Sequence, residues 1–170
     1  GVVLRASNRN YTNDGTTPAQ LVTLTNGLQA LARDGATEGD TPYIPLFIAI
    51  DHLSPSDSFA DGMPQGGFTQ LPSPLALGAT WNLAFADTAG RIAGQELNAV
   101  GINLLLGPNL DLTSTLNNGR GASTTFGGNA YWVGALGQAF MQGVQAGSGN
   151  HVGVIARHFP GMGSSDRTQD

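Results

Sequence analysis

The sequence predicts an α/β fold built on a parallel sheet, and three observations predict it. Four short apolar runs alternate with segments of helical periodicity, an order that implies parallel strands joined by right-handed crossovers. The runs are almost continuously apolar rather than alternating, as in strands that are covered on both faces. The chain has 170 residues, whereas a closed barrel of eight strand–helix units needs about 250. A doubly wound sheet and about half of a (β/α)8 barrel both agree with these observations.

The apolar runs give four predicted strands, at residues 2–6, 45–50, 102–106 and 152–156, with three helices between them. The first helix begins with Thr17 as N-cap, followed by Pro18 at its first position and Gln20 closing a capping box. Its predicted buried stripe repeats at intervals of three and four residues and consists of Leu21, Leu24, Leu28 and Leu31. The second helix covers roughly residues 83–100, and the third begins after Asn129 as its N-cap.

Composition excludes several classes of function. Hydrophobic residues make up 40% of the chain, enough for a folded core, and the length suits one domain. Seven arginines and no lysine stand against twelve acidic residues, a net charge of −5 that argues against nucleic-acid or anionic-membrane partners. No apolar run is long enough to span a membrane. The absence of cysteine excludes a thiol nucleophile and does not fix the compartment, so secreted and cytoplasmic locations both stay open.

Polar side chains follow each predicted strand, and in a parallel α/β fold these positions share one face. The residues at these four ends are Ser7, Asn8 and Arg9, then Asp51 and His52, then Asn109 and Asp111, then Arg157 and His158. Carboxylates and guanidinium groups together can hold a polyhydroxylated ligand. Polar residues also end most strands for purely structural reasons, so the whole set favours a site more than any single member does. No metal-ligand motif and no complete phosphate-binding loop occurs, so we expect no metal and no cofactor.

Four segments, in this order, resemble glycoside hydrolase family 3, nearest to its bacterial β-N-acetylhexosaminidase branch. They are residues 68–80 (FTQLPSPLALGAT), 96–103 (ELNAVGIN), 107–111 (GPNLD) and 157–163 (RHFPGMG). The resemblance implies the N-terminal (β/α)8 barrel of that family, entered at its second strand and left after its fifth. Residues 1–170 would then be one partial barrel domain, cut at both ends. It also implies retaining hydrolysis of terminal β-linked N-acetylglucosamine or of a related β-glycoside.

The resemblance carries sugar-binding roles to several positions. Asp51 matches the family's substrate-binding aspartate, while Arg157 and His158 match a lysine–histidine pair that holds sugar hydroxyls. Arginine keeps the charge of that lysine but not its shape. Where the family has a substrate-gripping arginine, this chain has Thr124, with Arg120 close by in the sequence. We therefore predict that Asp51, Asp111, Arg120, Arg157 and His158 bind substrate.

The catalytic groups of the family are harder to find in this chain. A retaining glycosidase needs a nucleophile and a proton donor about 5–5.5 Å apart. The branch uses an aspartate–histidine dyad as acid/base, and the matching positions here hold Thr168 and Asp170. A carboxylic acid such as Asp166 or Asp170 could replace the dyad if burial raised its pKa. The family's nucleophilic aspartate follows a later strand, beyond these residues.

Two functions follow from this comparison of residues with the family pattern. The first is a family 3 glycosidase with an altered acid/base, whose missing barrel half comes from the same polypeptide or from a partner. The second is a non-catalytic carbohydrate-binding or scaffold relative that keeps Asp51, Arg157 and His158 for binding. An unrelated doubly wound domain is a third alternative, and it requires a reversal of the strand order.

Overall fold

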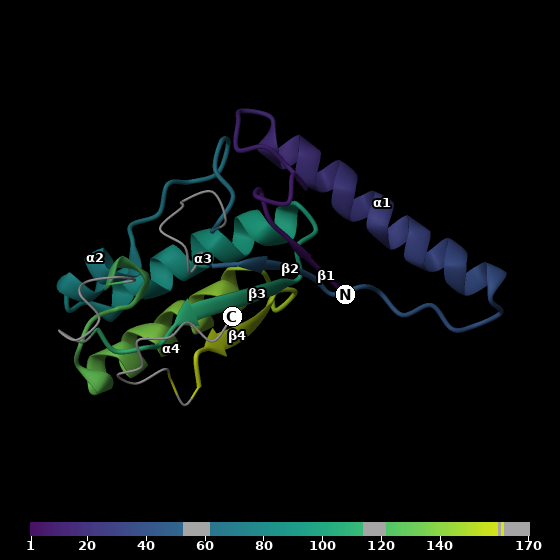
Figure 1. Cartoon of the computed structure of the whole chain (residues 1–170). Coiled ribbons are helices and arrows are strands. Elements are labelled where there is room, and N and C mark those ends of the chain that lie inside the picture. The colour runs from purple at the N-terminus through teal and green to yellow at the C-terminus, as the bar shows by residue number, and fades with distance from the viewer. Residues whose placement is uncertain (53–61, 114–121, 160, 162–170) are drawn as a thin grey trace.

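A computed structural model describes residues 1–52, 62–113, 122–159 and 161 of the chain (Figure 1). Its strands are β1 (Val2–Leu4), β2 (Ile48–Asp51), β3 (Leu104–Asn109) and β4 (Gly153–Arg157). Its helices are α1 (Thr17–Glu38), α2 (Pro74–Ala79), α3 (Leu83–Ala99) and α4 (Ala130–Gly147), with a 3-10 turn, η3, at Ala122–Thr124. The sheet runs β1-β2-β3-β4 with every neighbouring pair parallel. The strand order does not reverse, so the described sheet winds in one direction as in a barrel.

The register of the strands separates the two faces of the sheet. Leu4, Ile50, Leu105 and Val154 lie side by side. They belong to the core together with residues of α3 and α4 such as Leu97 and Phe140. Successive side chains of a strand point to opposite faces, so Val3 and Ile155 lie on the other face. These two are 43% and 48% exposed, and no described element covers them.

Helices α3 and α4 approach each other closely because glycines line their contact. The positions are four residues apart in each helix: Gly90 and Gly94 in α3, Gly143 and Gly147 in α4. A Cβ atom at any of them would lie 2.1–2.2 Å from a backbone carbonyl oxygen of the facing helix. No side chain fits at that distance, so the two helix backbones themselves form the contact.

Asparagine caps begin both of these helices. The Asn82 side chain accepts a hydrogen bond from the Ala84 amide, and Asn129 accepts one from the Trp132 amide. The N-cap predicted at Asn129 and the helix predicted for 83–100 are therefore confirmed. Helix α2 was not predicted; Ser73 caps it, and its six residues are too few to show a helical repeat. The four strands are also confirmed, with ends that shift by up to three residues.

The predicted start and stripe of α1 are partly wrong. Thr16 occupies the N-cap position without a capping hydrogen bond from its side chain, and helix begins at Thr17. Gln20 does not close a capping box, because its amide nitrogen donates to the hydroxyls of Thr12 and Thr16. Leu21 is buried, but Leu31, at the far end of the expected stripe, is 71% exposed. In Figure 1 that half of the helix extends away from the sheet.

Among the described residues, no helix combines the length and apolar character that crossing a membrane requires.

Candidate substrate-binding site

An irregularity in β3 aligns the strand ends that form the site. Leu106 pairs with Ile155, but the next pair joins Asn109 to Arg157, so β3 has one more residue than β4 across this step. Gly107 lies in this bulge with a φ of +137°, a backbone conformation that favours glycine. A Cβ atom added at Gly107 would lie only 2.4 Å from the Cβ of His52. The bulge therefore brings β3 close to the end of β2 and sets Asn109 level with Arg157.

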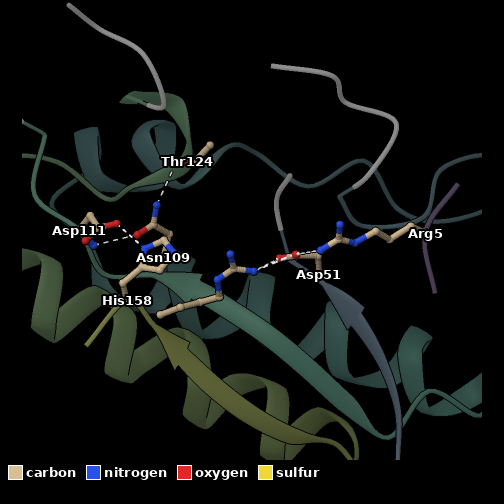
Figure 2. A network of polar contacts seen from close by, with 7 residues as sticks. Arg5, Asp51, Asn109, Asp111, Thr124 and His158 are labelled. Carbon is tan, nitrogen blue, oxygen red and sulfur yellow. Dashed lines mark hydrogen bonds and ion pairs between the residues drawn. The ribbon is translucent and has the colours of Figure 1, made fainter. Parts of the chain in front are cut away.

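A buried carboxylate at the end of β2 forms the centre of the site. One guanidinium nitrogen of Arg157, Nη1, donates to both carboxylate oxygens of Asp51 at 2.8 Å. The Asp51 side chain is only 2% exposed, which strengthens this ion pair relative to a surface pair. On its other side, Nη2 of Arg5 lies 3.5 Å from the same carboxylate. Figure 2 shows Asp51 reached by the long Arg5 side chain.

A second polar group joins the ends of β3 and β4. Nδ1 of His158 lies 2.6 Å from a carboxylate oxygen of Asp111. The Asp111 amide donates to the Asn109 side chain, whose nitrogen donates to the hydroxyl of Thr124 at 3.1 Å (Figure 2). The family resemblance implies an arginine at position 124. The residue here is Thr124, and its hydroxyl orients the Asn109 side chain. These contacts hold the His158 ring in one place at the end of β4.

His52 is a buried aromatic group of the site. Its ring packs against Phe140 with 4.7 Å between the ring centres, and its amide donates to the Leu106 carbonyl. Burial lowers the pKa of His52 to about 4, so the imidazole is neutral at neutral pH. Within the described part of the chain its Nδ1 atom has no hydrogen-bond partner. His52 therefore shapes the wall of the site as an uncharged ring.

A small pocket opens between the ends of β2, β3 and β4. Its lining residues are Asp51, His52, Leu106, Gly107, Asn109, Arg157 and His158. The expectation that strand ends gather polar side chains at one place is therefore met for Asp51, Arg157, His158 and, through His158, Asp111. That these residues bind a sugar stays a prediction.

One contributor to the site was not predicted from the sequence, and three predicted residues lie outside the described part of the chain. The predicted first strand, residues 2–6, includes Arg5, but β1 ends at Leu4 and Arg5 turns toward Asp51. Its position directly after an apolar run was the available signal. Arg120, Asp166 and Asp170 lie outside the described residues. The described part contains no cluster of three or more acidic or histidine side chains arranged to hold a metal ion.

A sheet that winds in one direction, with charged side chains gathered at the carboxyl ends of its strands, defines a barrel-type α/β domain with its site at the mouth. The profile described as "Glycosyl hydrolase family 3 N terminal domain" matches residues 9–169. The chain belongs to glycosyl hydrolase family 3.

Relatives of known name agree with this assignment. The chain is 31% identical to a β-hexosaminidase A of Pseudoalteromonas piscicida over 97% of its length, and 33% identical to a β-hexosaminidase of Thiobacillus denitrificans over 96%. The crystal structure of native NagZ from Neisseria gonorrhoeae superposes with a TM-score of 0.73, at 30% identity over 96% of the chain. The chain spans 25%, 40% and 43% of these three proteins respectively.

Proposed function

We propose that the intact protein hydrolyses terminal β-linked N-acetylglucosamine with retention, and that the described residues form the sugar-holding part of its site. The observation that carries the proposal is the buried Asp51 carboxylate at a strand end, held by Arg157 and open to a pocket. A fixed carboxylate accepts hydrogen bonds from vicinal hydroxyls, while guanidinium and imidazole groups donate to ring substituents. Relatives that carry the name β-hexosaminidase support this class of substrate.

The residues of the pocket would act on the sugar by orienting it. Asp51, Arg157 and His158 are held by ion pairs from different strands, so the sugar meets groups that need little rearrangement. Retention then requires a carboxylate that attacks the anomeric carbon and an acid that protonates the departing oxygen. We assign the acid to Asp166 or Asp170 and the nucleophile to the part of the protein outside this chain. Arg120 would complete the grip on the sugar.

We also propose that the second half of the barrel covers the open face of the sheet. Val3 and Ile155 are apolar and exposed on that face, and the relatives are more than twice as long as this chain. The missing strands come from the same polypeptide or from a partner chain. An intact-mass measurement on the natural protein distinguishes the two, because a single polypeptide has a mass well above 17.5 kDa.

The alternative is a non-catalytic carbohydrate-binding relative of the same barrel. It is favoured by the residues at the positions of the acid/base dyad, where the chain has Thr168 and Asp170 instead of aspartate and histidine. The sugar-holding group at Asp51 would be kept, and the protein would bind its ligand without cleaving it.

One experiment separates these functions. The intact protein is incubated with 4-nitrophenyl N-acetyl-β-glucosaminide, and binding of N-acetylglucosamine is measured by calorimetry. Release of nitrophenol supports the hydrolase. In the calorimetric measurement, Asp51→Asn should reduce sugar affinity at least tenfold, because a charge-assisted hydrogen bond is lost. Asp34→Asn, an exposed change on α1, is the matched control and should leave affinity unchanged. Binding without release supports the alternative, and neither binding nor release contradicts both.

A further inference from the structure

Two guanidinium groups share one carboxylate at the mouth of the site. Arg157 donates to both oxygens of Asp51, and Arg5 approaches the same carboxylate from the side of β1. The register explains the second contact: Leu4 pairs with Ile50, so the next residue of each strand, Arg5 and Asp51, meet at the same level. This group of three side chains carries two positive charges and one negative charge.

That excess of positive charge is unusual for this chain. Acidic residues outnumber arginines by twelve to seven, and two arginines of the helices each have an acid of their own. Arg33 pairs with Asp34, and Arg91 pairs with Asp87 at 2.7 Å. Beside the site, the Asp111 carboxylate contacts His158. A second carboxylate for Arg5 would satisfy the local charge, and a ligand can supply one.

The donors that a ligand would need are available. Arg157 uses Nη1 alone for Asp51, and among the described residues its Nε and Nη2 donate no side-chain hydrogen bond. The Arg5 guanidinium likewise makes no hydrogen bond within the described chain beyond its 3.5 Å ion pair. The Arg5 side chain is 43% exposed, and Arg157 lines the pocket. Guanidinium groups with free N–H pairs favour planar or tetrahedral oxyanions.

We propose that Arg5 selects a sugar that carries an anionic substituent, a phosphate, sulfate or carboxylate group, and that Arg5 and Arg157 bind this group beside Asp51. The inference rests on the proposed function, because it adds a charge requirement to the same sugar site. Arg5 is then a specificity-determining residue, whereas Asp51 and Arg157 serve neutral and acidic sugars alike.

Calorimetry on the intact protein tests the proposal with a matched set of ligands. The ligands are N-acetylglucosamine, its 6-phosphate, its 6-sulfate, its 3-sulfate and inorganic phosphate. At least one acidic sugar should bind about tenfold more tightly than the neutral sugar, the gain expected for a hydrogen bond between charged groups. The preference should shrink as salt is raised, since the Arg5 side of the site is open to solvent.

Variants assign the preference to Arg5. Arg5→Gln should abolish the preference for the acidic sugar over the neutral one, while Arg5→Lys should retain part of that preference because the charge remains. Arg33→Gln removes an equal charge from α1 and should change neither affinity. Circular dichroism confirms that each variant is folded.

Three results would overturn the inference. If none of the acidic sugars binds more tightly than N-acetylglucosamine, the inference is contradicted while the proposed function stays intact. A preference that survives in Arg5→Gln contradicts the role of Arg5, and equal affinity for inorganic phosphate contradicts the sugar as ligand. If neither the neutral nor the acidic sugars bind, the proposed function itself fails.

Discussion

The buried imidazole of His52 makes the stability of the protein depend on pH. Burial lowers its pKa from 6.5 to about 4, so the unfolded state binds more protons than the folded state between these values. The contribution of His52 to stability is therefore complete above about pH 6.5 and is lost as the pH falls toward 4. The expected loss is about 3 kcal/mol, measured as the free energy of unfolding in urea at a series of pH values.

Two variants isolate the effect of this one ring. His52→Phe keeps an aromatic ring against Phe140 but cannot be protonated, so its stability should fall less between pH 6.5 and 4. His151→Phe removes an exposed histidine at the entry to β4 and should keep the full pH dependence. Identical pH profiles for the natural protein and His52→Phe would show that His52 is not the titrating group.

At this scale the sequence predicted which polar side chains lie close together where topology alone decides their proximity. Asp51, Arg157 and His158 follow apolar runs, and parallel strands end at one edge, so their proximity needs no further information. Arg5 was missed because its role depends on the register of β1 against β2, which no local pattern contains. The packing of His52 against Phe140 was also not predicted, because α4 lies far along the chain and no local pattern shows that the two rings meet.

At the scale of elements, the contact between α3 and α4 depends on glycine. A Cβ at position 94 would lie 2.2 Å from the Val144 carbonyl oxygen, and both partners are backbone in helices. Gly94→Ala should therefore separate the helices and destabilise the protein by about 2 kcal/mol or more, despite the higher helix propensity of alanine. The midpoint of thermal or urea unfolding measures the change.

The matched control lies in α4. A Cβ added at Gly134 would have no atom of the described residues within 4 Å, so Gly134→Ala should be neutral or stabilise the protein by about 0.5–1 kcal/mol. Equal effects at 94 and 134 would contradict the close contact and leave only an intrinsic effect of glycine in helices.

The elements themselves were largely predictable, because caps and periodicity are local. Asn129 starts α4, and residues 83–100 form α3 almost within the expected bounds. The predicted buried stripe of α1 is too long. Periodicity shows which residues share a face of the helix, but not how much of that face another element covers, and Leu31 lies beyond the covered part. The glycine contact was not predicted, because a glycine inside a helical pattern only indicates a less stable helix until the facing helix is known.

At the scale of the whole molecule, the two faces of the sheet differ in what covers them. One face is buried under α3 and α4 around Leu105 and Phe140. The other holds the charged site at the strand ends, where Asp51 lies, and apolar side chains below it. Strands β1 and β4 are the two edges of the described sheet, and closure into a barrel removes such edges. This agrees with a barrel wall, whose inner face would carry both the polar side chains of the candidate site and the apolar side chains below them.

If a second half closes the barrel, Ile155 is an interior residue even though it is 48% exposed among the described residues. Ile155→Ala in the intact protein should then cost about 2–5 kcal/mol, the range for removing a buried isoleucine side chain. Phe85 on α3 is the comparison, because its side chain has a similar exposed fraction, 53%, and α3 is flanked by described elements. Phe85→Ala should cost about 1 kcal/mol or less. Urea unfolding of both variants measures the difference. A cost near zero for Ile155→Ala would mean that the face stays open to water and that no further strands complete the barrel.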